Sequence, residues 1–254
     1  MRVIAVLNQK GGVAKTTTVI NVAHILATEH RKRVLVVDAD SQGNLTEFFG
    51  ADPQQGNLAN ILLRNETAYF NAQTTAWPGL EILPASDRLM ELDLSKIQNG
   101  TVKVERLKKT LSDLEGAVRF DFVLIDCPPA FTASCAAALI AATEVMIPIK
   151  LDAFSMRGMA NLMAQIQNMK KLNPALHVGG CLETMWSGSQ ADAWSNDLLR
   201  KSGLPIYETR IRASKQVGAM TFAGKPLRES SPNCAASVDY RRLCREIVGG
   251  GCNG

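Results

Sequence analysis

The sequence of 254 residues lacks the features of membrane and secreted proteins. No apolar run approaches the roughly 18 residues that a membrane-spanning helix needs. The run at residues 2–7 is also too short for the core of a signal peptide. We therefore expect a cytoplasmic protein with no membrane partner. Internal repeats, heptads and low-complexity segments are missing too, which excludes repeat proteins and coiled coils.

Closely spaced cysteine pairs are missing as well. The six cysteines are widely scattered and include no C-x-x-C motif, which argues against a zinc ribbon or a disulfide scaffold. We expect reduced thiols that serve mostly as small buried apolar side chains. They are Cys127, Cys135, Cys181, Cys234, Cys244 and Cys252.

A strong overall charge is the third missing feature. The chain has 28 Lys and Arg against 24 Asp and Glu, and the net charge of +4 is too small to imply an acidic partner by itself. The distribution is uneven, however. Residues 200–245 contain ten basic and three acidic side chains, a net charge of +7, so the basicity belongs to the C-terminal part.

What the sequence does have is an alternation of short apolar runs with helical patterns, as in a parallel sheet covered on both faces. The apolar spacing at residues 19–26 predicts one helix, and the spacing at 159–166 predicts another. Residues 51–79 are polar and irregular, so we expect a surface excursion or short helices there. The predicted strands are residues 3–7, 33–37, 80–83, 120–125, 144–149 and 178–182.

This alternation predicts an α/β fold with a single doubly wound, mostly parallel sheet and helices on both faces. The length suits one domain of residues 1–248. Residues 249–254, GGGCNG, are expected to form a flexible C-terminal tail.

The stretch NQKGGVAKTTT at residues 8–18 lies between the first predicted strand and the first predicted helix, where a phosphate-binding loop belongs. Gln9 and Ala14 stand where the common template has glycine. Even so, backbone N–H groups of the loop can converge on phosphate oxygens at the positive N-terminal end of the helix. Lys15 would neutralise the β and γ phosphates, and the Thr16 hydroxyl would ligate Mg²⁺. The alternative is a plain Gly-Gly turn before a helix that starts with an exposed lysine.

Three aspartates favour the nucleotide site over that alternative. Asp38 and Asp40 follow one apolar run and Asp126 follows another, and such strand ends face the ligand crevice of doubly wound folds. Mg²⁺ keeps most of its waters and is held through one or two carboxylates. We predict a metal site of Thr16, Asp38 and Asp126, with the two carboxylates acting through water. A carboxylate at residue 38 or 40 would orient the attacking water.

These motifs together make the chain resemble the ParA/MinD group of P-loop ATPases, and most of all the small ParA (Soj-type) DNA-partition ATPases. The deviant Walker A loop K-G-G-x-x-K-[ST] is matched by residues 10–16. VDADSQGN at 37–44 and IDCPP at 125–129 resemble two further family motifs. EVMIPIKLDAFSMRGM at 144–159 is similar to a family stretch that includes a switch-like segment, and IRASKQVGAMTFAGKPL at 211–227 occupies the place of a late family motif.

The resemblance implies an ATPase that uses ATP and Mg²⁺ and is slow without a partner. In such proteins two subunits sandwich two ATP molecules, and the lysine in the position of Lys10 reaches the partner subunit's phosphates. The ATP-dependent homodimer would bind DNA without sequence preference, associate with the nucleoid, and be stimulated by a ParB-like adaptor in chromosome or plasmid partition. The catalytic residues carried over are Lys10, Lys15 and Asp40. The nucleotide-binding residues are Lys10, Gly11, Gly12, Val13, Ala14, Lys15, Thr16 and Thr17.

The basic C-terminal part suits DNA binding of this kind, because phosphate neutralisation by Lys and Arg supplies most of the non-specific affinity. For each single cation the plain alternative is a solvated charge at a helix end. The DNA-binding candidates are Arg210, Arg212, Lys215, Arg241, Arg242 and Arg245.

The sequence departs from the family pattern in three places. Ser41 replaces a proline, which should loosen that turn because the fixed φ is lost. Ala14 replaces a glycine and adds a methyl group near the phosphates. We predict helical φ and ψ for residue 14, a conformation in which alanine is unstrained. The segment ASKQVGAM lacks the acidic residue common in the late motif, which weakens any carry-over of function there.

Other functions stay open at this point. A MinD-like cell-division regulator works on membranes and normally needs a basic amphipathic C-terminal helix, which GGGCNG after Val248 is not expected to supply. An ATP-loaded binding switch with little hydrolysis is the second alternative, and Ala14 keeps it open. An iron-protein reductase relative has less support, because it would need paired cluster cysteines from two subunits.

Overall fold

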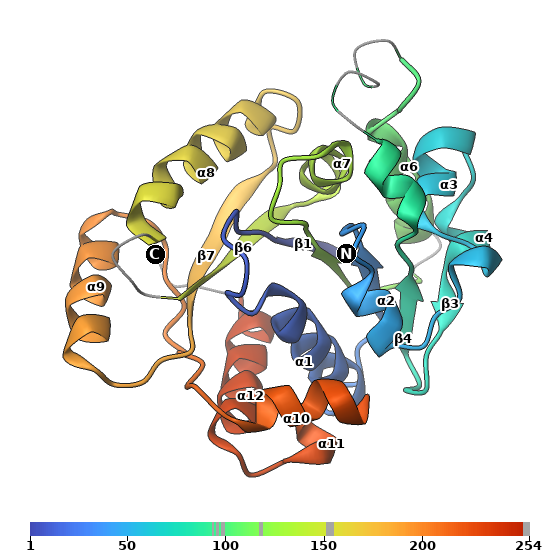
Figure 1. Ribbon diagram of the computed structural model, residues 1–254. Coiled ribbons are helices and arrows are strands. Elements are labelled where there is room, and N and C mark those ends of the chain that lie inside the picture. Colours follow the sequence, from blue (N-terminus) through green and yellow to red (C-terminus); the bar gives the residue numbers. More distant parts are fainter. Residues whose placement is uncertain (93, 95–96, 98–99, 117–118, 151–154, 251–254) are drawn as a thin grey trace.

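A computed structural model describes residues 1–92, 94, 97, 100–116, 119–150 and 155–250, with side chains from residue 158 onward in the last range. Its centre is a seven-stranded sheet in the order β3-β4-β2-β5-β1-β6-β7 (Figure 1). Neighbouring strands are parallel except for β3 and β4. The strands are β1 (Arg2–Val6), β2 (Val34–Asp38), β3 (Gln73–Thr74), β4 (Leu80–Leu83), β5 (Phe122–Asp126), β6 (Glu144–Lys150) and β7 (His177–Thr184).

Helices cover both faces of the sheet, so the predicted fold class is confirmed (Figure 1). One face holds α1 (Lys15–Thr28), α10 (Gln216–Ala223), α11 (Leu227–Ser230) and α12 (Ala235–Val248). The other holds α3 (Leu58–Arg64), α6 (Glu105–Gly116), α7 (Ala133–Ala141) and α8 (Ser155–Lys170). The remaining elements are α2 (Asn44–Phe48), α4 (Ala68–Asn71), α9 (Gln190–Lys201) and the 3₁₀ turns η1 (Pro53–Gln55) and η2 (Asp87–Glu91).

Each central strand contributes alternate side chains to two separate cores. In β1, Val3 and Ala5 face the core beneath α6, α7 and α8, whereas Ile4 and Val6 face the core beneath α1 and α12. Side chains of a strand point alternately to the two sides of the sheet. Because both sides are covered by helices, the strands read as continuous apolar runs in the sequence.

The strands lie within two residues of their predicted bounds at either end. The short polar strand β3 was not predicted. Residues 51–79 form short helices as expected, although α3 buries Leu58, Ile61 and Leu62 completely. Residues 151–154, which belong to the switch-like stretch, and residues 251–254 of the expected tail lie outside the described residues. The boundary between domain and tail stays a prediction.

Two simpler expectations concern membranes and cysteines. Across the part of the chain that the structure describes, no helix combines the length and the apolar character needed to cross a membrane. Cys127, Cys135, Cys181 and Cys244 are buried, as predicted, and Cys234 is half-buried. Cys252 lies outside the described residues.

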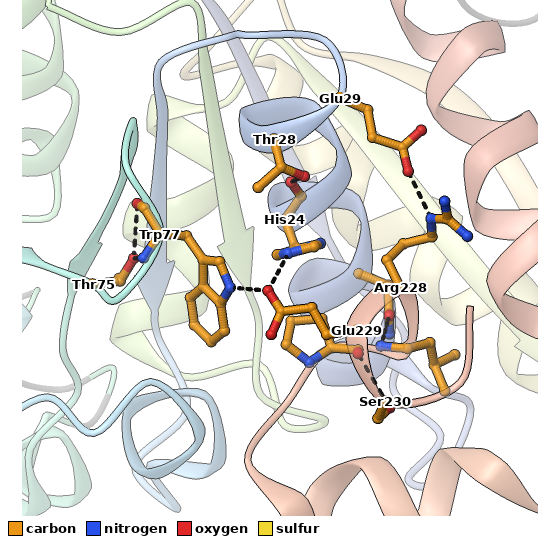
Figure 2. A network of polar contacts seen from close by, with 11 residues as sticks. His24, Thr28, Glu29, Thr75, Trp77, Arg228, Glu229 and Ser230 are labelled. Atoms are coloured by element: carbon orange, nitrogen blue, oxygen red, sulfur yellow. Dashed lines mark hydrogen bonds and ion pairs between the residues drawn. The ribbon is translucent and has the colours of Figure 1, made fainter.

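A polar network joins the C-terminal half of α1 to α11 and to the loop before β4 (Figure 2). His24 is 3% exposed, and its Nε2 lies 3.1 Å from Glu229 Oε1. Trp77 Nε1 donates to the same oxygen, and the Trp77 ring meets the imidazole edge-on with centroids 5.6 Å apart. Burial lowers the pKa of His24, although the hydrogen bond with Glu229 opposes the shift. His24 Nδ1 is buried and has no hydrogen-bond partner among the described residues.

Two ion pairs reinforce this end of α1. Glu29 Oε1 accepts from Arg228 Nε at 2.6 Å, and Glu29 Oε2 accepts from Arg241 Nε at 2.7 Å. Hydrogen bonds from both guanidinium groups lower the pKa of Glu29, although its partial burial opposes that shift. The C-terminal end of α1 is thus tied to α11 and α12, and its charges are paired.

Candidate nucleotide site

The predicted nucleotide loop connects β1 to α1 and is held in place by side chains from its own first residues. Asn8 Nδ2 donates to Pro148 O of β6 at 2.7 Å, and Gln9 Nε2 donates to Gln165 Oε1 of α8 at 2.7 Å. Gln9, which replaces a template glycine, therefore anchors the loop to the helix layer. Neither residue was among the predicted site residues. Their position directly after a buried strand is the signal that could have found them.

A third anchor comes from the far edge of the sheet. Thr184 Oγ1, at the end of β7, donates to Val13 O at 3.1 Å. Both residues are buried. The loop is thus fixed from three elements that are distant in the sequence, which favours one loop shape before a ligand binds.

Two residues of the loop have left-handed backbone conformations. Gly12 has φ 71°, and Ala14, directly before α1, has φ 67° and ψ 32°. The prediction of helical φ and ψ for residue 14 is therefore wrong. The helix begins at Lys15, and residue 14 forms the reversal that leads from the loop into the helix. Because the left-handed conformation costs an L-residue about 1–2 kcal/mol, the alanine at this position carries backbone strain.

Lys15 lies inside the loop rather than in solvent. It is 8% exposed, and its Nζ donates to Lys10 O at 3.2 Å across the loop. Burial lowers the pKa of Lys15, and the nearby Asp126 carboxylate opposes the shift. The alternative of an exposed lysine at a helix start is therefore excluded. An ammonium group buried at the N-terminal end of α1 suits phosphate binding.

Asp126 ends β5 directly beside Asp38, its partner in the register of β2 and β5. Thr16 Oγ1 donates to Asp126 Oδ2 at 2.6 Å, whereas Asp126 Oδ1 is buried without a hydrogen-bond partner among the described residues. Burial and the charge of Asp38 raise the pKa of Asp126 to about 8. A buried carboxylate oxygen that lacks a donor, beside a threonine hydroxyl, fits a bound Mg²⁺ ion.

Asp38 is buried too, but both oxygens of its carboxylate accept hydrogen bonds from the chain. Oδ2 accepts from N and Oγ1 of Thr46 at 2.8 and 2.7 Å, and Oδ1 accepts from Asp40 N at 3.1 Å. Thr46 Oγ1 also accepts from Ala85 N at 2.9 Å. Burial raises the pKa of Asp38 to about 6, and the bonds from Thr46 oppose the shift. Asp38 therefore holds the loop after β2, and its water-mediated role at the metal stays a prediction.

Asp40 lies in that loop and is the least buried of the three aspartates. Its Oδ1 accepts from Gln42 N at 3.0 Å, and its carbonyl oxygen accepts from Gly43 N at 3.0 Å. These hydrogen bonds close the turn that contains Ser41, the residue that replaces the family's proline. A carboxylate that is held at its base and only half-buried suits the predicted task of orienting a water.

Three of the six predicted DNA-binding cations line one cleft of about 470 Å³ between the end of β7 and α12, and they are Arg210, Arg212 and Arg242. The Arg210 guanidinium lies 4.4 Å from the centre of the Trp186 ring and 2.6 Å from the buried Glu183. Arg212 pairs with the buried Asp239 at 2.7 Å. These guanidinium groups are therefore oriented by carboxylates of the chain.

The other cations are spread over the surface. Arg241 belongs to the Glu29 pair at the far end of α1, and Lys215 and Arg245 are exposed. Glu183 and Glu29, which lie outside residues 200–245, thus neutralise part of the +7 charge of that segment. The structure does not bring the six cations into one group, and their contact with DNA stays a prediction.

Comparisons with known proteins establish the family. Residues 1–178 match a family model described as an AAA domain. Over 257 aligned residues the chain is 33% identical to the chromosome partitioning protein ParA of Caulobacter vibrioides, covering 98% of this chain and 94% of that protein. The chain belongs to the ParA/MinD family of P-loop ATPases. The resemblance inferred from residues 10–16, 37–44 and 125–129 is thereby confirmed.

Further similar proteins extend the ParA/MinD assignment. The chromosome-partitioning ATPase Soj of Thermus thermophilus is 33% identical over 251 residues, with 98% of this chain and 96% of Soj covered. The structure of cobyrinic acid a,c-diamide synthase from Mycobacterium smegmatis with a bound ATP analog and magnesium superimposes with a TM-score of 0.81. It is 30% identical, and the match covers 98% of this chain and 94% of that one. A ParA/MinD-type fold thus holds an ATP analog and magnesium in that enzyme.

Proposed function

We propose that the chain is a ParA-like DNA-partition ATPase. It binds ATP and Mg²⁺, dimerises in that state, binds DNA without sequence preference, and releases the DNA when a ParB-like adaptor stimulates hydrolysis. The observation that carries the nucleotide part is the unpartnered Asp126 Oδ1 beside Thr16 and the buried Lys15. The similarity to ParA of Caulobacter vibrioides and to Soj of Thermus thermophilus supports the partition role.

Each side chain of the site has a task in this proposal. Lys15 neutralises the β and γ phosphates, Thr16 and Asp126 hold the metal, and Asp40 orients the attacking water. When bound, Mg²⁺ neutralises charge on the phosphate oxygens. Lys10 adds a second cation at the partner subunit's phosphates, where charge develops during transfer. The backbone N–H groups of residues 11–17 position the phosphates.

DNA binding is assigned to the basic C-terminal part. The exposed cations Lys215, Arg242 and Arg245 can meet phosphates without breaking a close ion pair. Arg210 and Arg212 would contribute as oriented, partly neutralised groups. Because each phosphate contact releases counterions, the affinity for DNA should fall steeply as salt is added.

DNA co-sedimentation and phosphate release, each with Mg-ATP, with Mg-ADP and without nucleotide, test this proposal. We expect DNA binding only with ATP, with an affinity that falls as salt rises. Lys15→Ala should abolish ATP binding and DNA binding together, whereas Lys171→Ala, at an exposed lysine after α8, should change neither. DNA affinity that needs no ATP and changes little with salt would contradict the DNA-binding part.

An ATP-loaded binding switch with little hydrolysis is the second candidate. The left-handed Ala14 favours it, because this position carries both backbone strain and a methyl group at the predicted phosphate loop. Steady-state phosphate release with DNA and adaptor present separates the two candidates. Turnover that stays near zero under those conditions would favour the switch. Vesicle pelleting tests the MinD-like alternative, which would be favoured by a chain that pellets with vesicles when ATP is present.

A further inference from the structure

α10 is an apolar helix that the rest of the chain leaves largely uncovered. Its sequence, QVGAMTFA, contains no charged residue, yet only Met220 of its eight residues, all described, is buried. Phe222 is 95% exposed. A helix that is apolar around its whole circumference is normally buried. An uncharged, exposed helix with a projecting aromatic ring therefore indicates a contact with another molecule.

Although α10 is exposed, it is held in place by contacts with α1. Asn21 of α1 donates from Nδ2 to Met220 Sδ at 3.3 Å and to Thr17 O at 2.8 Å. Asn21 Oδ1 accepts from Leu227 N, at the start of α11, at 2.9 Å. α10 is thus fixed to the first turns of α1, next to the predicted nucleotide-binding residue Thr17.

A cleft of about 670 Å³ opens beside Phe222, between α10, α1 and α2. Ile20 and Phe48 contribute apolar wall. Uncharged polar side chains, Thr16 and Thr17 among them, line the end nearest the predicted nucleotide loop. Glu47 is the only charged side chain among the described residues that line it. The same patch of surface therefore carries a projecting phenylalanine and a hollow large enough for one.

We infer that this cleft receives Phe222 of a second copy of the chain, in a two-fold contact in which each α10 covers the other copy's cleft. A patch with both a projection and a matching hollow is self-complementary, as an isologous two-fold interface requires. Its near-absence of charge lets two copies meet without repulsion between like charges and matches the composition of interface centres. Because Thr16 lies in the cleft, the contact is continuous with the nucleotide end of α1.

The inference rests on the proposed ATP-dependent dimer and deepens it. The partner copy would add a side chain beside residues 16–20, so nucleotide loading and dimer contact would share the first turns of α1. ATP bound at Thr16 and Thr17 would then favour the cleft shape that accepts the partner's aromatic ring.

Sedimentation of wild-type protein with a non-hydrolysable ATP analogue and Mg²⁺ provides the first test, with a fluorescent ATP analogue reporting nucleotide affinity. Phe222→Ala and Phe222→Glu should each raise the dimer dissociation constant by about tenfold or more, as for a central aromatic anchor. Nucleotide affinity of the monomer should stay within about twofold, and Phe70→Ala, at the 76% exposed phenylalanine of α4, should behave as wild type.

Crosslinking between differently tagged chains provides the second test. Phe222→Cys chains mixed with Glu47→Cys chains should form a disulfide between the two tags under mild oxidation in the presence of ATP. Phe70→Cys mixed with Glu47→Cys should not, and wild-type mixtures report any background from native cysteines.

The outcomes separate this inference from the proposed function. A wild-type dimer that forms with ATP but is unchanged in both Phe222 variants and gives no crosslink would overturn the inference alone. So would Phe222 variants that dimerise normally yet lose stimulation by an adaptor, since the patch would then belong to that partner. A wild-type chain that binds nucleotide but stays monomeric would overturn the proposed dimer as well.

Discussion

The two ends of α1 each bury a polar side chain with one unused atom, in opposite electrostatic settings. At the nucleotide end Asp126 Oδ1 has no partner among the described residues, and burial beside Asp38 raises the pKa of Asp126 to about 8. At the far end His24 Nδ1 has none, and burial lowers the pKa of His24 (Figure 2). The nucleotide end of α1 buries two neighbouring acids, Asp38 and Asp126, whereas the far end buries the neutral imidazole ring of His24.

The two ends differ in how far neighbouring side chains balance the charge around the buried group. Asp38 and Asp126 are adjacent acids with one buried lysine, Lys15, close by, so a further cation would lower the energy of the site. Around His24, by contrast, Glu229 binds Trp77 and Glu29 binds two arginines, so no further ion is needed. A buried unused atom thus indicates a ligand when the charge around it is also unbalanced.

Asp126→Asn should give the largest effect at the nucleotide end. The amide keeps the size of the side chain but removes the charge that holds the metal. We expect ATP hydrolysis to fall about a hundredfold or more, roughly 2.7 kcal/mol in activation free energy. The melting temperature of nucleotide-free protein should not fall, because the amide oxygen can still accept from Thr16 and the other oxygen has no hydrogen-bond partner among the described residues to lose. Phosphate release and thermal melting measure the two effects.

The matched control for that change is Asp197→Asn at an exposed carboxylate of α9, which should change neither property. Full turnover in Asp126→Asn would contradict the metal role. A melting temperature that drops sharply in Asp126→Asn would show that the carboxylate serves structure, as the network around His24 does.

Glu229→Ala should produce the reverse pattern at the far end. Trp77 and His24 lose their shared acceptor, so the free energy of unfolding should fall by about 1–2 kcal/mol, or roughly 2–8 °C in melting temperature. Turnover per folded molecule should stay unchanged. Urea unfolding and phosphate release test this, with Glu91→Ala at an exposed carboxylate as the control. A loss of turnover without a loss of stability would remove the contrast between the two ends.

The pH dependence of stability should reveal the neutral ring of His24. Its folded pKa lies below the unfolded value, so the unfolded chain takes up a proton first as pH falls through about 6.5. The contribution of His24 to stability should therefore fall as the pH is lowered from 7 to 5, by at most about 1.4 kcal/mol per pH unit for this one proton, whereas the raised pKa values of Asp38 and Asp126 act in the opposite direction. Urea unfolding of wild type and of His24→Gln isolates this contribution, because the variant should gain stability relative to wild type as the pH falls over that range. Identical slopes in the two proteins would contradict the assignment.

Ala14→Gly should give the smallest effect, a gain. Glycine adopts the left-handed conformation without strain, so the free energy of unfolding should rise by up to about 1 kcal/mol. Ala27→Gly, the same chemical change inside α1, should instead lower stability by about 1 kcal/mol or more. Paired urea melts measure both. A loss of stability in Ala14→Gly would show that the loop relaxes away from the left-handed conformation in solution.

The features that the sequence revealed are those encoded by neighbouring residues. The six longer strands and the loop of residues 10–16 depend on local apolar runs, glycines and a following helix. β3 escaped prediction because two polar residues carry no such signal, and its place depends on pairing with β4.

The features that escaped prediction depend on contacts between distant segments. The conformation of Ala14 follows from a loop that Gln165 and Thr184 hold in place. The hydrogen bonds to Asp38 need Thr46, whose hydroxyl in turn accepts from Ala85 N. The pairing of the predicted DNA-binding arginines likewise needs acids from other elements, which a count of charges along the chain does not show.

Consecutive residues of β7 serve two parts of the protein, because Glu183 pairs with Arg210 and Thr184 binds the carbonyl of Val13. Only one peptide unit separates the anchor of the phosphate loop from the anchor of the arginine cleft. For protein engineering, the two therefore form one module. A chimera that transplants the loop needs a hydroxyl at the end of its last strand, and a redesign of the cleft through Glu183 alters the residue beside the loop's own support.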